Sequence, residues 1–119
     1  MAWSIEVSTT ARDDLRAIYR FLVKTHHESF GHDLASADAQ ASLRIDVITR
    51  SLERIANAPH MGTRITTPGG TFRFVSFDRT VYWFRLKAET ETVVVESIFH
   101  GGQDHLGRMM ARLMAEGDG

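Results

Sequence analysis

The spacing of apolar residues changes in character at about residue 72. Before that point apolar residues repeat with the three- to four-residue period of a helix, whereas after it they form three short runs rich in aromatic and β-branched residues. These runs predict strands over 72–77, 80–88 and 92–99. Both faces of the first two strands are largely apolar, which is more than a sheet with one face in water needs. We therefore expect helices on one face and, on the other, a partner or a terminal helix.

The first helical segment runs from Thr10 to about His26. Thr10 and, three residues later, Asp13 have the pattern of a capping box that begins a helix. The apolar residues fall on one face, with the spacing i, i+3, i+4, i+7: Leu15, Ile18, Tyr19 and Leu22. This segment is therefore predicted to be an amphipathic helix that packs on a core.

A second, longer helix is predicted from about Ala35 to Asn57, and Pro59 ends it. Its apolar residues step by four, three, four and three, which keeps them on one face: Ala41, Ile45, Ile48, Leu52 and Ile55. The connection between the two helices is polar and contains Gly31. Two consecutive helices joined in this way are expected to pack as an antiparallel αα-hairpin.

Three further segments complete the predicted element order. Residues 4–8 alternate and indicate a short strand, and residues 60–71, which contain one proline and three glycines, are expected to be a loop. Residues 104–116 carry an amphipathic stripe that includes three methionines, which indicates a C-terminal helix. Core packing explains this stripe, and the alternative is a mobile helix that can detach.

The fold class predicted from this order, β-α-α-β-β-β-α, is α+β. We expect one domain over residues 1–119, with a small antiparallel sheet and the αα-hairpin packed on one of its faces. Hydrophobic content of 43% and charged content of 24% are ordinary for a globular protein. No apolar run approaches the roughly 20 residues that cross a bilayer, and no signal peptide pattern is present. The absence of cysteine excludes disulfides, so a cytoplasmic protein without a membrane partner is expected.

Charge is unevenly distributed. The net charge of −1 argues against a protein that is basic all over and binds DNA directly by bulk charge. Between Arg50 and Lys87, however, seven basic residues stand against two acidic ones, a local net charge of +5. This segment is either a solvated sheet edge and loop or a basic surface for an acidic partner. No fixed metal-ligand spacing and no phosphate-binding or dinucleotide motif occurs, so neither a metal nor a cofactor is expected.

Four segments, in this order, resemble signatures of the RelE/ParE superfamily of type II toxin–antitoxin toxins. They are Ala11-Arg-Asp-Asp-Leu15 with Ile18-Tyr19, then Asn57-Ala-Pro-His-Met-Gly62, then Phe72-Arg73 with Val81-Tyr-Trp-Phe-Arg85, and last His100-Gly101-Gly-Gln-Asp104. The resemblance covers about residues 3–105 and leans to the ParE side. It implies a toxin that inhibits DNA gyrase by protein binding and that is neutralised by a cognate antitoxin encoded beside it.

The RelE side of the superfamily implies a different activity, the cleavage of mRNA on the ribosome. Such an endoribonuclease needs groups that activate the ribose 2′-hydroxyl and stabilise a charged phosphorane. Arg73, Arg85 and His100 are the candidates for that role, with His105 nearby in the sequence. The family's closing motif usually has an arginine where this chain has Gln103. This departure favours a binding toxin over an enzyme, with a non-toxic interaction module as a further alternative.

Candidate contact residues follow from the basic segment and from the resemblance. For the target we predict contacts from Arg73, Arg79, Arg85 and the C-terminal segment. For the antitoxin we predict a tail that covers exposed apolar surface and brings acidic side chains to the basic segment. The residues predicted to contact it are Leu15, Tyr19, Arg50, Arg54 and Trp83.

Overall fold

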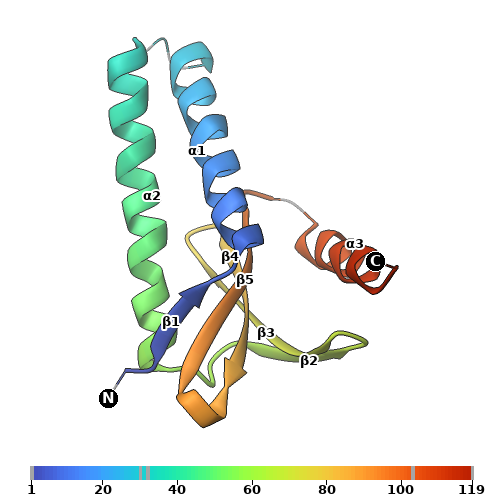
Figure 1. The fold of residues 1–119 in the computed structure, drawn as a ribbon. Helices are drawn as coiled ribbons and strands as arrows, with labels where there is room; N and C mark the ends of the chain where they lie inside the picture. The colour runs from blue at the N-terminus through green and yellow to red at the C-terminus, as the bar shows by residue number, and fades with distance from the viewer. Residues whose placement is uncertain (1, 30, 32, 103, 119) are drawn as a thin grey trace.

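A computed structural model describes every residue except 1, 30, 32, 103 and 119. It contains a five-stranded sheet, a helical hairpin and a C-terminal helix (Figure 1). The elements are β1 (Ser4–Val7), α1 (Thr9–Ser29), α2 (Leu34–Asn57), β2 (Thr63–Thr67), β3 (Gly70–Phe77), β4 (Thr80–Lys87), the short 3₁₀ helix Ala88–Thr90, β5 (Thr92–His100) and α3 (His105–Asp118). The predicted α+β class and the predicted hairpin of helices are confirmed.

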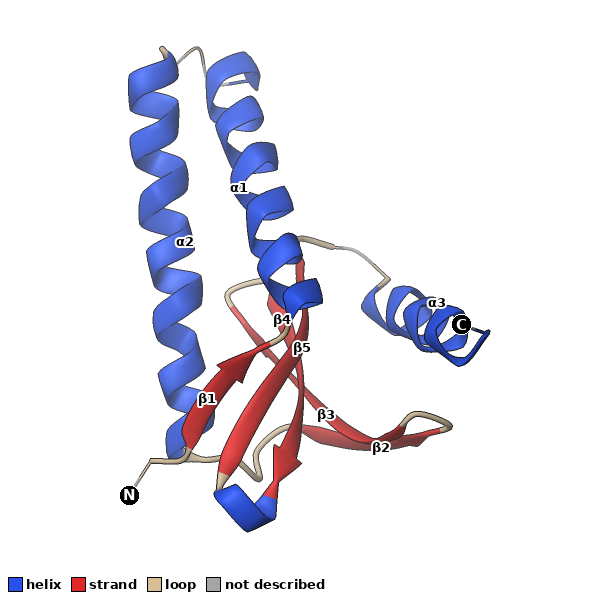
Figure 2. Cartoon of the chain, in the orientation of Figure 1, coloured by secondary structure: helices blue, strands red, loops and turns tan. Residues whose placement is uncertain are grey.

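The sheet has the strand order β1-β5-β4-β3-β2 (Figure 2). β2, β3, β4 and β5 pair antiparallel in sequence, whereas β1 pairs parallel to β5. The expectation of a purely antiparallel sheet is therefore wrong at one edge. Parallel neighbours need a long connection, and the helical hairpin together with three strands supplies it between β1 and β5.

Residues 60–71 are not a loop throughout, because they contain β2. Its residues include Ile65 and three threonines, which suit a pleated strand, and β2 pairs with β3 in register. Thr67 closes the hairpin turn: its hydroxyl donates to the Gly70 carbonyl at 2.9 Å and accepts from the Gly69 N–H at 3.1 Å. Gly62 precedes β2, and Pro68 and the two glycines that follow it lie at the turn after the strand. The sequence did not predict β2 because these residues flank it closely on both sides.

The beginning of α1 also differs from the prediction. The helix begins at Thr9, and the Ser8 hydroxyl accepts a hydrogen bond from the Ala11 N–H at 3.0 Å. The same hydroxyl donates to the Glu96 carbonyl at 2.9 Å, which fixes the start of α1 against β5. Ser8, not the predicted Thr10–Asp13 box, therefore caps the helix.

The α1–α2 hairpin covers one face of the sheet and extends beyond it (Figure 1). Alternate residues of β4 and β5, such as Tyr82, Phe84 and Val95, are buried against the two helices. The other face is covered by α3, which buries Trp83 and Phe99. The apolar character of both faces is thus explained by a terminal helix of the chain itself. None of the helices in the described part of the chain is long and apolar enough to cross a membrane.

Candidate functional site: a basic cleft between α1 and α3

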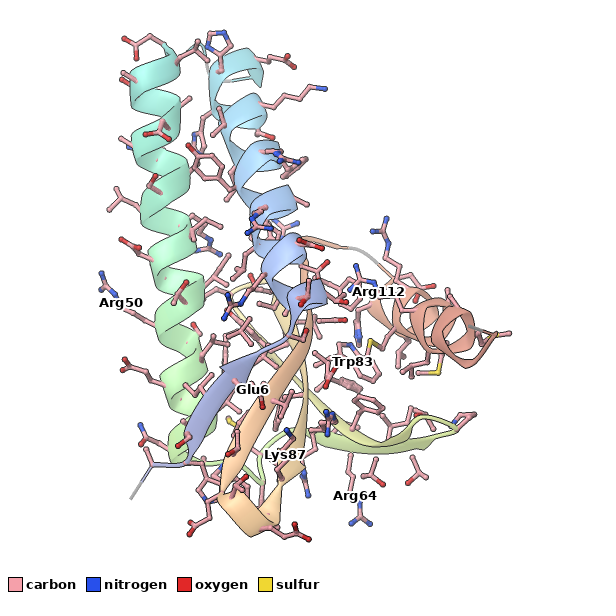
Figure 3. All side chains as sticks on the ribbon, viewed as in Figure 1. Glu6, Arg50, Arg64, Trp83, Lys87 and Arg112 are labelled. Atoms are coloured by element: carbon pink, nitrogen blue, oxygen red, sulfur yellow. The ribbon has the colours of Figure 1, made fainter. Side chains whose placement is uncertain are left out.

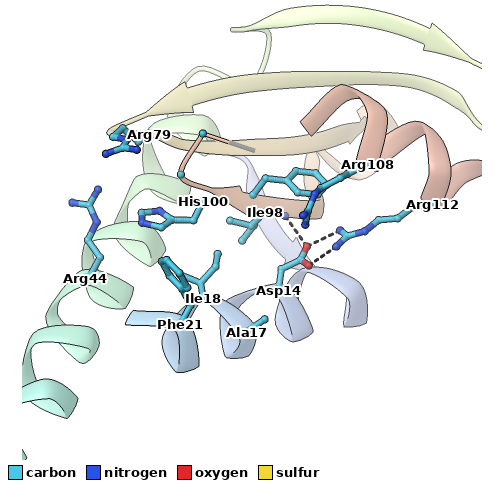
Figure 4. A pocket seen from close by; sticks show the side chains of 13 residues that line it. Asp14, Ala17, Ile18, Phe21, Arg44, Arg79, Ile98, His100, Arg108 and Arg112 are labelled. Atoms are coloured by element: carbon cyan, nitrogen blue, oxygen red, sulfur yellow. Dashed lines mark hydrogen bonds and ion pairs between the residues drawn. The ribbon is translucent and has the colours of Figure 1, made fainter. Parts of the chain in front are cut away.

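A cleft of about 690 Å³ opens where α1, the end of β5 and α3 meet (Figure 4). A volume of this size is typical of ligand-binding clefts. Its walls come from four parts of the fold: α1, α2, the β3–β4 turn and the segment from β5 into α3. Residues distant in sequence therefore converge at this place.

The end of β5 forms the floor of the cleft. At Gly101 the backbone has φ +83°, a left-handed conformation that glycine adopts without steric cost. The Gly101 N–H donates to the Arg79 carbonyl at 2.9 Å, so the end of β5 is tied to the β3–β4 turn. The adjacent His100 ring lies 2.8 Å from the Thr80 hydroxyl. The backbone at the end of β5 is therefore held in a tight geometry beside His100.

Asp14 holds the two walls of the cleft together. Its Oδ2 accepts hydrogen bonds from the Ile98 N–H and from Arg112, both at 2.9 Å, and its Oδ1 accepts from the second nitrogen of Arg112 at 2.7 Å (Figure 4). Arg112 also donates to the Ser97 hydroxyl at 2.8 Å and lies over the Phe99 ring. A two-pronged arginine–carboxylate pair fixes geometry as well as adding energy. This pair therefore anchors α3 to α1 and β5.

The other charged groups of the cleft are positive. Arg44 from α2, Arg79 from the β3–β4 turn and Arg108 from α3 line it together with His100 (Figure 4). The pKa of His100 is lowered from its ordinary value, first by burial and then by the positive charges of Arg44 and Arg79. Burial and the two neighbouring arginines thus act in the same direction and disfavour the protonated form of His100.

The β3–β4 turn places Arg79 at the cleft through an unusual backbone. Asp78 and Arg79 have φ +49° and +67°, in the left-handed region. Two-residue hairpin turns of this kind favour Asn-Gly, and an L-residue there costs roughly 1–2 kcal/mol. Arg44 steadies the turn by donating to the Asp78 carbonyl at 2.7 Å. The arginine is therefore kept at a position where glycine would fit with less strain.

The structure separates the residues predicted to contact a target, Arg73, Arg79 and Arg85, and the nuclease candidate His100. Arg79 and His100 lie in the cleft, whereas Arg73 and Arg85 do not. Arg73 stands opposite Phe84 on the hairpin side of the sheet and donates to the His60 carbonyl at 2.7 Å. Arg85, the next residue after Phe84, points to the opposite face and pairs with Glu96 at 2.6 Å.

The residues predicted to contact an antitoxin also differ in accessibility. Leu15 and Tyr19 are half-buried and pack against the core between the helices and the sheet. Arg50 is exposed and points away from α2 (Figure 3), and Arg54 is exposed with its guanidinium 3.9 Å from the centre of the Phe77 ring. Trp83 is fully buried and points toward α3, where its indole N–H donates to His105 at 3.1 Å (Figure 3).

Sequence reasoning did not single out four residues of the cleft, Asp14, Arg44, Arg108 and Arg112, although the last two belong to the C-terminal segment predicted to contact a target. Asp14 was seen only as part of an acidic pair at the start of α1, and the sequence gives no sign that it reaches β5 and α3. Arg44 and Arg108 lie on helices whose rotation about their axes is set by packing, so the sequence alone does not indicate that their side chains face a common cleft. Gln103, on which the argument against an enzyme partly rested, lies outside the described residues.

Comparisons with known proteins agree on the fold. The sequence matches no protein-family model and no curated protein. Among solved structures, the chain is similar to the chromosomal ParDE toxin–antitoxin system of P. aeruginosa, with a TM-score of 0.61, 16% identity, and coverage of 84% of this chain and 97% of the other. It is also similar to the RelBE2 toxin–antitoxin complex of Mycobacterium tuberculosis, with a TM-score of 0.55, 18% identity, and coverage of 84% and 99%.

Proposed function

We propose, from its RelE/ParE-superfamily fold, that this chain is the toxin of a bacterial type II toxin–antitoxin module. The fold correspondence covers 97% and 99% of the similar chains from two toxin–antitoxin systems, which supports this proposal. The four sequence segments that resemble the family lie on this scaffold in the same order. The partner expected from this assignment is a cognate antitoxin encoded beside the toxin gene, and the expected location is the cytoplasm.

Within this assignment we propose that the toxin acts by binding DNA gyrase and not by cutting RNA. The observation that supports binding is the dispersal of the candidate nuclease residues. His100 stands opposite Thr80, five residues along β4 from Arg85, which corresponds to roughly 17 Å of strand. Arg73 and Arg85 project from opposite faces of the sheet. General acid–base groups must lie within hydrogen-bond reach of one substrate, and this arrangement does not bring the three together.

Antitoxin contact with Trp83 would require α3 to leave the sheet, because Trp83 lies fully buried beneath that helix. We propose instead that α3 stays in place, so that Trp83 is not a contact and the antitoxin meets the hairpin at Leu15, Tyr19, Arg50 and Arg54.

Two assays run in parallel test the proposed target. Purified protein is added to gyrase with relaxed plasmid and, separately, to translating ribosomes with a defined mRNA. Loss of supercoiling with intact mRNA is the expected result, and induced expression should arrest growth unless the antitoxin is co-expressed. Codon-linked mRNA cuts with normal supercoiling would replace gyrase inhibition with RNA cleavage. Normal growth on induction would instead favour the non-toxic interaction module.

A further inference from the structure

The cleft between α1 and α3 has a surplus of positive charge. Arg44, Arg79 and Arg108 take part in none of the ion pairs found among the described residues. Among the described residues that line the cleft, Asp14 alone is acidic, and the hydrogen bonds from Arg112 and from the Ile98 N–H occupy its carboxylate. Three guanidinium groups therefore face a shared space without a carboxylate of their own.

One wall of the same cleft is apolar. Phe21 from α1 is 60% exposed, and Ala17 and Ile18 lie beside it in the lining. A small inorganic anion would neutralise the arginines but leave this surface in water. A ligand that carries carboxylates and apolar groups together would satisfy both walls, because burial of apolar area and charge pairing would act at once.

We propose that the cleft binds an acidic, amphipathic peptide segment of the antitoxin. Its carboxylates would pair with Arg44, Arg79 and Arg108, and an apolar side chain would cover Phe21. The identity of the partner rests on the proposed function, whereas the chemistry of the segment rests on the cleft itself. Guanidinium groups suit this role because their planar donors match carboxylate geometry.

The backbone at Arg79 supports this assignment. Glycine would occupy its left-handed position with less strain, yet the turn carries an arginine whose side chain lines the cleft. Of the non-glycine residues with positive φ among the described residues, Asp78, Arg79 and Glu91, Arg79 is the one that lines the cleft, and this coincidence fits a role of its side chain beyond folding. Replacing Arg79 by glycine should therefore separate binding from stability, since it removes a cleft cation and relieves the turn.

The test uses the complete protein and a fluorescent synthetic peptide that repeats Glu-Glu-Leu-Leu, followed by anisotropy. The expected result is binding that weakens by about tenfold in the triple variant Arg44→Ala, Arg79→Gly, Arg108→Ala. Arg79→Gly alone should weaken binding severalfold while its thermal unfolding midpoint stays equal or rises. Binding of the peptide should also raise the pKa of His100, followed by NMR, because carboxylates would offset the charges of Arg44 and Arg79.

Matched controls separate this site from general attraction between charges. Glu91 has φ +48° and lies outside the lining, so Glu91→Gly gives similar backbone relief without removing a cleft cation and should leave affinity unchanged. A Lys-Lys-Leu-Leu peptide should not bind. Equal affinity of the acidic peptide for the wild type and the triple variant would overturn the proposal. Tighter binding of a single-stranded RNA oligonucleotide, lost in the triple variant, would overturn it in favour of a phosphate ligand.

This test can fail independently of the proposed function. If the protein arrests growth and the co-expressed antitoxin neutralises the triple variant as well as the wild type, the cleft assignment is wrong while the toxin assignment stands. If the protein is not toxic but the acidic peptide binds with the expected losses, the peptide site stands and its partner is a protein other than an antitoxin.

Discussion

The two faces of the sheet are covered in different ways. On the hairpin side, twelve buried residues of the described chain form one continuous core across α1, α2, β4 and β5. On the other side, four buried residues lie between α3 and the sheet, and the Asp14–Arg112 pair adds a polar anchor. Since burial of apolar area supplies most of the folding energy, the first face is expected to contribute more to the stability of the fold than the second.

Two adjacent aromatic residues of β4 test this comparison with the largest effects. Phe84 and Trp83 are both fully buried, but Phe84 packs under the hairpin and Trp83 under α3. Phe84→Ala should lower the free energy of unfolding by about 3–5 kcal/mol, because it leaves a cavity in the main core. Trp83→Ala should first increase hydrogen exchange in α3, before exchange rises in β4 and β5.

Chemical denaturation and native-state hydrogen exchange of the two variants provide these values. The proposed difference between the two faces would be wrong if Phe84→Ala increased hydrogen exchange in α3 alone. It would also be wrong if Trp83→Ala unfolded the hairpin and the sheet in the same step as α3.

The polar anchor of α3 gives the next largest effect. Asp14→Ala leaves the half-buried Arg112 without its carboxylate and removes the acceptor of the Ile98 N–H, at a cost of about 2–3 kcal/mol. The neighbouring residue Asp13 provides a matched control, because its ion pair with Arg16 is exposed. Asp13→Ala should change stability by about 0.5 kcal/mol or less.

Urea denaturation measures both variants, and hydrogen exchange in α3 indicates whether the loss is local. Equal costs for Asp13→Ala and Asp14→Ala would mean that the pair with Arg112 does not anchor the helix.

Protonation of His100 gives a smaller, pH-dependent effect at the end of β5. Folding lowers the pKa of this histidine from its ordinary 6.5 through burial and through Arg44 and Arg79. The unfolded chain therefore binds the proton more readily, so the native state loses stability as the pH falls through 6.5 toward the folded pKa. In His100→Gln this part of the acid destabilisation should be absent.

Denaturation curves of the wild type and of His100→Gln, measured from pH 7.5 to about pH 5 across the range in which histidine titrates, test the sign. As the pH falls, the free energy of unfolding of the wild type should decrease more than that of His100→Gln. A shift in the opposite direction would contradict a lowered pKa.

The contrast between the two faces also explains what the sequence could predict. The sequence predicted the helices of the hairpin from periodic apolar residues such as Ile48 and Leu52, and it predicted β4 from its run of aromatic residues. In both cases the pattern also indicated which side chains point into the core. The parallel pairing of β1 with β5 and the strand β2 were missed, because pairing partners and short edge strands depend on the assembled sheet. The cleft was found only in part, because Asp14, Arg44 and Arg108 meet through helix packing that leaves no local pattern.

The part of the second face that α3 leaves uncovered should be the least sensitive region. There Lys87 reaches across from β4 to Glu6 on β1 at 3.3 Å, and both side chains are exposed (Figure 3). Exposed pairs of this kind contribute little, because water and salt screen them, so Lys87→Ala should cost no more than about 0.5 kcal/mol. Double-mutant cycles with Glu6→Ala at low and high salt measure the coupling. A coupling that rivalled the cost of Asp14→Ala would show that charge pairs, and not α3, hold this face together.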